Sequence, residues 1–526
     1  MSGGAQSSEP PNSALAERQR GDLGNRFTLN VLSNYAALTV NLVVGLFLTR
    51  FLVHRLGDEM YGAWALIGSV MMYLGLVDLG FGSSIQKYMA EFAAHGAEAK
   101  IGRLLSTTLV LFSGLGLALL ILAFVVSPLI GTVFQISAGS VDEARTALIL
   151  MGLVQGIALP LGVFNGALVG LQRMDLNNTI SVAGTGVIVV FVVNLVNAGW
   201  GLPGICMAYL VVTLLSGMVR FLCVRRLLPG MRLSLSGYDR SLVRTTSAYG
   251  LTFFGLKIAH FLKYNTDSFV IAGFLSTAAV TPFAVANRLA TMIRQIVEQA
   301  VEALIPVFSQ LNSLEDTGRI RLIYMQAGKV TMGIAAPITL FVCAFARPIL
   351  QAWLVDVPRQ ADVLTVILAI TVFASVVPAV SVKLMLGVAK HRTLAIITLV
   401  DSVVNLILSI LLVRPYGLVG VALGTMVPLV ITHVFVFPWL GCRLIGMSAP
   451  AFLGELARAA FLPMLPAGAA VWALLTYARP GSAAMLLLEA VLIGALYVVF
   501  FALWSLDASE REIYISRVRK LIAAKG

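Results

Sequence analysis

Long apolar stretches recur along the whole chain and are separated by short connections that carry charge, proline or glycine. A helix that crosses the hydrocarbon core of a bilayer needs about 20 mostly apolar residues, and we count about 14 stretches of this kind. The pattern therefore predicts an all-α polytopic membrane protein. The predicted spans are 29–53, 61–89, 104–126, 147–169, 180–196, 202–224, 245–275, 282–310, 330–346, 363–388, 394–413, 418–439, 456–475 and 483–504.

The first twelve predicted spans form two halves that resemble each other at an offset of about 217 residues. The sequence GLQR at 170–173 matches GVAK at 387–390, and GLPGI at 201–205 matches GLVGV at 417–421. Because each half has an even number of spans, the two copies should point the same way through the membrane. We therefore predict two six-helix lobes related by a parallel repeat, followed by a helix pair without a counterpart.

The repeat sets the predicted domain boundaries. The first 25 residues are rich in Ser, Gly, Pro, Glu and Arg, and lack the short apolar core and cleavage site of a signal peptide. The predicted parts are a disordered cytoplasmic N-terminus (1–25), the first lobe (26–228), a basic cytoplasmic connection (229–244), the second lobe (245–442), the helix pair (443–506) and a basic cytoplasmic tail (507–526).

Composition and charge support a membrane protein and argue against a nucleic-acid partner. Apolar residues make up 59% of the chain and charged residues 12%, which is unlike a soluble domain. With both termini cytoplasmic, roughly 25 of the 37 Lys and Arg residues fall in inside segments, as the positive-inside rule requires. We therefore predict a multi-pass protein of the bacterial inner membrane. The richest inside connection carries Arg220, Arg225, Arg226, Arg232, Arg240 and Arg244.

The seventh and eighth predicted spans are polar on one side only. On each helix the polar residues fall within an arc of roughly 140°. The tenth span adds Lys383, and the first span has a narrower polar stripe. The polar residues of the eighth span are Asn287, Arg288, Thr291, Arg294, Gln295, Glu298, Gln299 and Glu302, those of the seventh are Tyr249, Lys257, His260, Lys263, Tyr264, Asp267 and Ser268, and those of the first are Arg26, Asn30, Asn34 and Asn41.

Five basic residues within these spans are predicted to bind an anionic substrate. Facing lipid at the bilayer centre would cost roughly 2.5 to 3.5 kcal/mol each, or about 12 to 18 kcal/mol in total, so they must face a cavity or each other. Guanidinium and ammonium groups suit a phosphate or pyrophosphate. The five residues are Lys257, Lys263, Arg288, Arg294 and Lys383.

Internal ion pairs are the alternative explanation for these charges. Lys263 with Asp267, and Arg294 with Glu298, are four residues apart and could neutralise each other on a helix. Counting the five basic residues against the carboxylates of Asp267, Glu298 and Glu302 leaves an excess of about two positive charges, which favours an anionic guest.

Two further sets of residues are assigned to the predicted cavity. His260 is more easily explained as a cavity-wall histidine than as a proton relay, and Asp78 equally suits a local cap. The predicted polar wall consists of Arg26, Asn30, Asn34, Asn41, His260 and Gln295, and the candidates for cation or proton coupling are Asp267, Glu298, Glu302 and Asp78.

Small residues and prolines predict packing and kinks. Gly162, Gly166 and Gly170 recur every four residues and predict a helix face for close packing. Pro378 is expected to kink the tenth span. The four cysteines lack CxxC spacing and are interpreted as small buried residues, so we expect no metal ligands among them, and we expect no cofactor.

Three segments near the N-terminus resemble a known family. NVLSNY at 30–35, RLGDEMYGAW at 55–64 and LVDLGFGS at 76–83 are similar to the N-terminal signature of oligosaccharide flippases. These form the polysaccharide transporter branch of the superfamily that also contains multidrug and toxic compound extrusion transporters and lipid II flippases. The resemblance implies two six-helix lobes around a cationic cavity that moves undecaprenyl-pyrophosphate-linked oligosaccharide to the periplasmic leaflet for O-antigen, capsule or exopolysaccharide synthesis.

Several alternatives share parts of this pattern. The same fold serves lipid II flippases, which tend to have cavity arginines where this chain has asparagines, and cation-coupled multidrug antiporters, whose first-span acidic residue is missing here. A membrane-bound polysaccharide polymerase or ligase would need a sizeable outside loop with catalytic residues. A scaffold for a polysaccharide assembly complex would tolerate a neutral cavity. The expected partners are a lipid-linked oligosaccharide, the bilayer and other polysaccharide assembly proteins, and no enzymatic activity is expected.

Overall fold

The computed structural model describes most of the chain, and the described part is helical. Every regular element among the described residues is a helix, and none of them is a strand. Side chains are described from residue 33 onward, apart from those of residues 76, 77 and 94. The described residues are 13–78, 81–95, 97–234, 238–244, 246, 258, 262, 265–477, 482–507 and 510–512.

Ten helices in the described part are long and apolar enough to cross a membrane, so the predicted all-α polytopic fold is confirmed. Two continuous stretches, Ser33–Leu74 with 42 residues and His391–Leu444 with 54 residues, exceed a single crossing. A helix of 42 residues is about 63 Å long, against about 30 Å for the hydrocarbon core. Each stretch is broken at a glycine with a positive φ, Gly57 at 73° and Gly417 at 57°. The total of fourteen spans stays a prediction.

The chain divides into two compact units, which are described separately. Gly62 belongs to the second unit because it packs closely on α10, where an added Cβ would lie 2.0 Å from the Thr277 carbonyl oxygen. The predicted lobe boundaries stay a prediction. The first unit contains Met1–Leu48, Val77–Ser127 and Thr146–Phe253, and the second contains Thr49–Leu76, Pro128–Arg145 and Phe254–Gly526.

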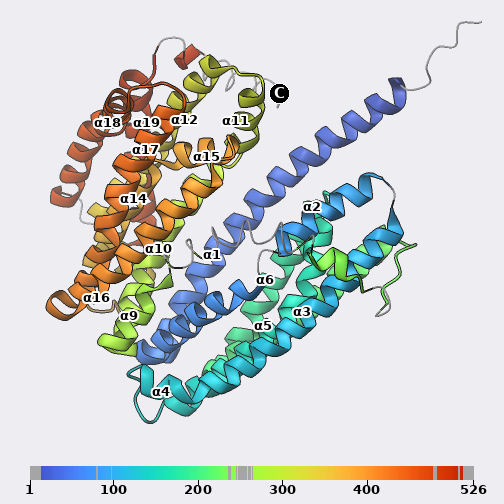
Figure 1. Ribbon diagram of the computed structural model, residues 1–526. Coiled ribbons are helices and arrows are strands. Elements are labelled where there is room, and N and C mark those ends of the chain that lie inside the picture. The colour runs from blue at the N-terminus through green and yellow to red at the C-terminus, as the bar shows by residue number, and fades with distance from the viewer. Residues whose placement is uncertain are drawn as a thin grey trace, which may run out of the picture. The chain divides into compact units, whose positions relative to one another are not determined.

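The first unit is built from the helices drawn in blue to green in Figure 1. Aromatic rings of Phe81 and Phe112 pack edge to face in its core, with centroids 5.9 Å apart, and Phe164 packs on Phe221 at 5.1 Å. Its helices are the first part of α1 (Ser13–Leu74), α2 (Phe81–Ala94), α3 (Glu98–Val126), most of α5 (Val141–Gly170), α6 (Met174–Asn197) and α7 (Gly201–Leu227).

The predicted glycine face of α5 is confirmed at two of its three positions. A Cβ on Gly170 would lie 2.6 Å from the Met89 Cβ, and one on Gly166 would lie 3.0 Å from the Ile85 Cγ2. These two glycines therefore let α2 pack closely on α5. The third position, Gly162, differs, because a Cβ there would meet nothing within 4 Å.

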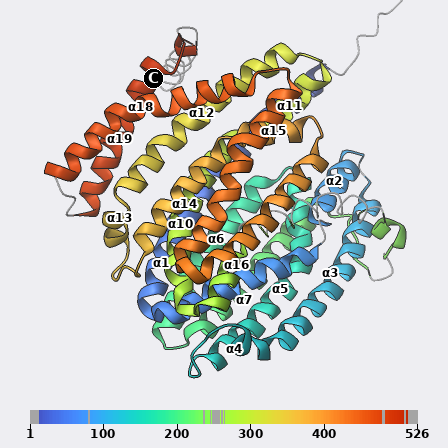
Figure 2. The same cartoon turned by 60° about the vertical axis from the view of Figure 1, so that its left-hand side comes forward.

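The second unit contains the remaining helices, drawn in green to red in Figures 1 and 2 from α9 onward, together with the cyan α4 and the second part of the blue α1. Its largest core cluster buries the rings of Phe308, Tyr324, Phe345, Phe452 and Tyr497. The helices are α4 (Ile130–Val133), α9 (Asp267–Phe274), α10 (Thr277–Val301), α11 (Leu304–Ser313), α12 (Thr317–Ala344), α13 (Ala346–Trp353), α14 (Ala361–Val376), α15 (Ala379–Gly387), α16 (His391–Val430), the π-helical segment Ile431–Val436, α17 (Phe437–Leu444), α18 (Ala449–Tyr477) and α19 (Ala483–Trp504).

Two predicted spans are broken into separate helices by proline. Pro378 separates α14 from α15, as predicted, because proline lacks the N–H that would continue the helical hydrogen bonds. The predicted span 282–310 is wrong as a single helix, since α10 ends at Val301 and α11 begins at Leu304. The ring of Pro306 would clash with the carbonyl of Glu302, four residues earlier, if the helix continued.

The same helix ending occurs at equivalent positions of the predicted repeat. Gln172 after α5 and Ala389 after α15 both have a φ of 58°. In each case the amide of the next residue donates to the carbonyl five positions earlier, at 2.9 Å for Arg173 and 2.8 Å for Lys390. This is the Schellman ending of a helix. The match supports the predicted offset of the repeat, whose full architecture stays a prediction.

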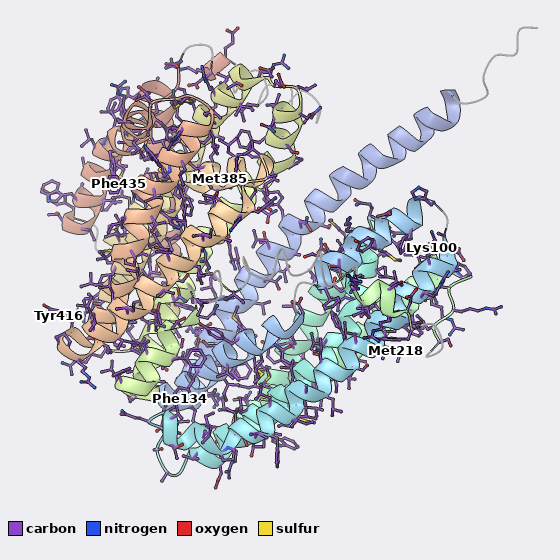
Figure 3. All side chains as sticks on the ribbon, viewed as in Figure 1. Lys100, Phe134, Met218, Met385, Tyr416 and Phe435 are labelled. Carbon is purple, nitrogen blue, oxygen red and sulfur yellow. The ribbon has the colours of Figure 1, made fainter. Side chains whose placement is uncertain are left out.

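Large apolar side chains are exposed on the surfaces of both units. Met218 on α7 projects away from the first unit, and Tyr416 and Phe435 project away from the second (Figure 3). Leu487, Leu488 and their neighbours on α19 are likewise exposed. In a soluble protein so much exposed apolar surface would be covered by a partner, whereas lipid covers it in a membrane.

Candidate functional site

Helix α10 presents one apolar and one charged face. Ser276 caps its first turn by accepting a hydrogen bond from the Ala279 amide at 3.1 Å. Ile293 and Val297 are buried on the apolar face. The charged face carries four ionisable residues, and Lys383 from α15 joins them. We call these five residues the α10 charged face, which consists of Arg288, Arg294, Glu298, Glu302 and Lys383.

Two ion pairs on the α10 charged face share one arrangement. The Arg294 Nε lies 4.0 Å from the Glu298 Oε1, and the Lys383 Nζ pairs with Glu302. Both cationic side chains are 15% exposed, whereas the carboxylate side chains are 52% and 59% exposed. The cations are therefore held in the protein, while their carboxylate partners remain accessible from outside.

Arg288 lies one to two turns closer to the start of α10. Its side chain is half-buried. Together, the three basic and two acidic residues of the α10 charged face carry a formal excess of one positive charge.

The structure supports part of the ion-pair alternative. The predicted pair of Arg294 with Glu298 is present. The pair of Lys383 with Glu302 was missed, because the two residues are far apart in the sequence and no helical spacing relates them. Asp267 is buried at the start of α9, and both of its oxygens lie 3.1 Å from the Thr425 hydroxyl, which donates to the carboxylate.

Several predicted site residues cannot be placed. Lys257, His260 and Lys263 lie outside the described residues. Arg26 and Asn30 belong to α1, and their side chains are likewise outside the described part. The assignments of these five residues stay predictions.

The remaining predicted residues are placed individually. Gln295 is half-buried on α10. Asp78 ends the 3₁₀ turn Gly75–Asp78 just before α2, and its Oδ2 lies 3.6 Å from where a Cβ on Gly82 would be. This position next to a helix start suits the predicted local cap. Its role in ion coupling stays a prediction.

The asparagines of the first span connect α1 to α6. Asn34 accepts a hydrogen bond from the Asn178 Nδ2 at 2.6 Å, and Asn41 accepts one from the Thr185 hydroxyl at 3.2 Å. Asn178 also donates to the Ser33 hydroxyl at 2.9 Å. These contacts give the polar stripe a packing function within the first unit, and its assignment to a cavity wall stays a prediction.

Arg220 is counted with the cytoplasmic connection in the sequence analysis, and its side of the membrane stays a prediction. It lies inside α7, seven residues before the helix ends at Leu227. Its Nε donates to the Asn177 Oδ1 and its Nη2 to the Ser181 hydroxyl, both at 2.9 Å.

A family model and a curated relative match most of the chain. The model of the family described as polysaccharide biosynthesis protein matches residues 24–312, which is more than half of the chain. The uncharacterized membrane protein EpsK of Bacillus subtilis (strain 168) is 21% identical over 508 residues, covering 94% of this chain and 98% of EpsK.

Solved structures with the same fold are transporters. The lipid II flippase MurJ in an inward closed conformation matches with a TM-score of 0.70 and 14% identity, over 90% of this chain and 98% of MurJ. An inward-facing multidrug resistance MATE family transporter of the MOP superfamily matches with a TM-score of 0.63 and 16% identity, over 78% of this chain and 94% of that chain. This chain is therefore a multi-pass membrane protein with the MATE and MurJ fold that belongs to the polysaccharide biosynthesis protein family.

Proposed function

We propose that the protein is a flippase for an anionic polyprenyl-pyrophosphate-linked oligosaccharide. It moves this substrate from the cytoplasmic to the periplasmic leaflet by alternating access, for O-antigen, capsule or exopolysaccharide synthesis. The family match and the fold shared with MurJ and MATE transporters support a transport role. In this proposal the protein resides in the bacterial inner membrane with both termini in the cytoplasm, and it makes or breaks no covalent bond.

The α10 charged face is the observation that carries the proposed substrate class. Arg294 and Lys383 are largely buried and are balanced by the exposed carboxylates of Glu298 and Glu302. A free cation in such a place would pay a large desolvation cost, but exchanging one anionic partner for another avoids most of it. A pyrophosphate can take the place of the exposed carboxylates, and Arg binds its oxygens through paired N–H donors.

Transport by the purified protein in proteoliposomes tests the proposal. The substrate is a purified undecaprenyl-pyrophosphate-linked oligosaccharide, and the variant is Arg288→Ala. We expect the initial transport rate to fall by roughly tenfold or more, because a hydrogen bond to a charged group contributes about 1.5 to 3 kcal/mol. The matched control is Arg458→Gln, which removes an exposed arginine of α18 that is paired with Glu455, and it should transport at the wild-type rate.

Two outcomes distinguish a wrong binding site from a wrong substrate class. A folded Arg288→Ala variant that transports at the wild-type rate would show that the α10 charged face does not bind the substrate. Absence of transport by the wild-type protein, with reconstitution verified, would reject this substrate class altogether.

Lipid II is the alternative cargo, and the same assay includes it. The match with the lipid II flippase MurJ covers more of this chain than the match with the MATE transporter, 90% against 78%. Transport of lipid II in preference to the lipid-linked oligosaccharide would favour this alternative. Transport of a cationic drug instead of either lipid would favour a multidrug antiporter.

A further inference from the structure

A polar pocket lies within the first unit, between three of its helices. It has a volume of about 330 Å³ and is lined by side chains of α5, α6 and α7. Gly162 on α5 leaves room for it, and Gly184 on α6 and Arg220 on α7 belong to its wall. The polar residues of the wall are Asn165, Ser181, Thr185, Tyr209, Thr213, Ser216 and Arg220.

The composition of this pocket differs from the rest of its helices. All three helices are candidate membrane spans, with mean hydropathy of 2.0 or more over their most apolar stretches. A patch that combines an arginine with hydroxyl and amide groups is costly against hydrocarbon. The pocket must therefore hold water or a polar ligand.

Arg220 has the geometry of an anion ligand. Its two described hydrogen bonds go to neutral oxygens, those of Asn177 and Ser181, and fix the guanidinium in place. Arginine has five N–H donors in total, so three remain. Because neither partner is a carboxylate, the positive charge is not neutralised by these contacts. A planar carboxylate or a phosphate can accept two parallel hydrogen bonds from the remaining donors.

We propose that this pocket is an oxyanion-binding site in which Arg220 binds a carboxylate or phosphate group. Thr213, Ser216 and Asn165 provide hydrogen bonds to the remainder of the ligand. The volume exceeds that of a single anion and leaves room for a ligand of about the size of one sugar ring. The pocket lies in the first unit, and the residues of the α10 charged face belong to the second. The oxyanion has two possible sources, the carboxylate of an acidic sugar or a phosphate group.

Thermal unfolding of the purified protein in detergent tests the site with three probes. Sodium glucuronate represents the carboxylate source, inorganic phosphate represents the phosphate source, and glucose is the neutral control at matched ionic strength. We expect glucuronate or phosphate to raise the unfolding temperature in a saturable way, because a ligand that binds only the folded state stabilises it. Glucose should have a much smaller effect.

Variants then assign the response to the pocket. Arg220→Gln should weaken binding of the active probe by roughly tenfold or more, the loss expected for a charge-assisted hydrogen bond. The matched control is Arg225→Gln, the same change in the last turn of α7 and outside the pocket wall, which should bind like wild type. Saturable stabilisation that is equal in both variants, or that is lacking for every probe, would overturn the proposal.

A second pair of variants keeps the test valid if Arg220→Gln fails to fold. A Cβ at Gly162 meets nothing within 4 Å, so Gly162→Phe can fill the pocket without displacing backbone. We expect it to abolish the response to the active probe. Gly186→Phe on α6 is the control, because a Cβ there also meets nothing within 4 Å and Gly186 is not part of the pocket wall. An undiminished response in a folded Gly162→Phe protein would place the anion elsewhere.

Discussion

At the scale of single residues, backbone conformation leaves one clear opportunity for stabilisation. Ala389 ends α15 with a φ of 58°, a region in which a Cβ is unfavourable. We expect Ala389→Gly to raise the free energy of unfolding by about 1 kcal/mol, since glycine is the preferred residue at this position of a Schellman ending. The midpoint of thermal unfolding in detergent measures the effect.

A control for this substitution lies a few residues further along the chain. Ala395 is inside α16, where Ala→Gly should lower stability by about 1 kcal/mol. Opposite signs for the two substitutions would confirm that the backbone conformation decides the result. A loss of stability in both variants would show that the Ala389 methyl group contributes packing that outweighs the strain.

The residue scale also shows where sequence reasoning fails. Lys383 pairs with Glu302 across 81 positions, and no periodicity in either segment indicates that α15 lies against α10 at this point. Arg294 and Glu298 are four apart on one helix, so their pairing could be predicted. Local spacing thus identifies contacts within a helix, whereas contacts between helices depend on packing that a single sequence does not reveal.

At the scale of helices, glycine determines how closely α3 and α5 approach. A Cβ on Gly116 would lie 2.1 Å from the Gly156 carbonyl oxygen, and backbone cannot move aside as a flexible side chain does. We expect Gly116→Ala to destabilise the protein by about 1 to 3 kcal/mol. The control is Gly114→Ala on the same helix, where a Cβ meets nothing within 4 Å, and it should be neutral or slightly stabilising in thermal unfolding. Equal midpoints for the two variants would contradict the close contact.

An ion pair attaches the segment after α19 to α12. The Lys329 Nζ lies 3.3 Å from the Glu510 Oε2, and the two residues are 5% and 7% exposed. Removing Lys329 leaves the buried Glu510 carboxylate uncompensated, so Lys329→Met should cost about 3 to 5 kcal/mol. Glu510→Gln should cost less, because Asp507, whose Oδ2 lies 3.7 Å from the Lys329 Nζ, remains a partner. In a double-mutant cycle of thermal unfolding, we expect the combined variant to lose much less than the sum of the two. Additive losses would mean that the two charges do not interact.

The sequence predicts helices better than it predicts their breaks. The last span was predicted as 483–504, and α19 has these bounds, because a long apolar stretch there follows Ser482, which caps the helix. The break between α10 and α11 was missed, although Pro306 provides the physical reason for it. Apolar composition alone favours continuing a span through such a position, and a proline does not by itself locate the break, since α12 continues through Pro337 and α18 through Pro463 and Pro466.

At the scale of the whole molecule, the charge of the cargo connects the proposed binding chemistry to the direction of transport. The α10 charged face has one more positive than negative residue, which suits an anion. Moving an anion outward across an inside-negative membrane gains roughly 2.3 kcal/mol per charge per 100 mV. The single excess positive charge of the α10 charged face is smaller than the negative charge of a pyrophosphate, so the complex of site and cargo should still be negative. The membrane potential should therefore accelerate the outward step.

Proteoliposomes with a potassium diffusion potential test this expectation. We expect an inside-negative potential, with the cytoplasmic side of the protein facing the lumen, to raise the initial rate of outward transport, and the reversed potential to lower it. The control is the same preparation with potassium equal on both sides, where valinomycin should change nothing. A rate that is the same at every potential would mean that the cargo's charge is balanced during movement, either by a co-transported cation or by a basic residue of the site, such as Lys383, that moves with the cargo. Measuring the rate again in a Lys383→Gln variant distinguishes these two cases, because only the second makes the potential dependence appear when the positive charge is removed.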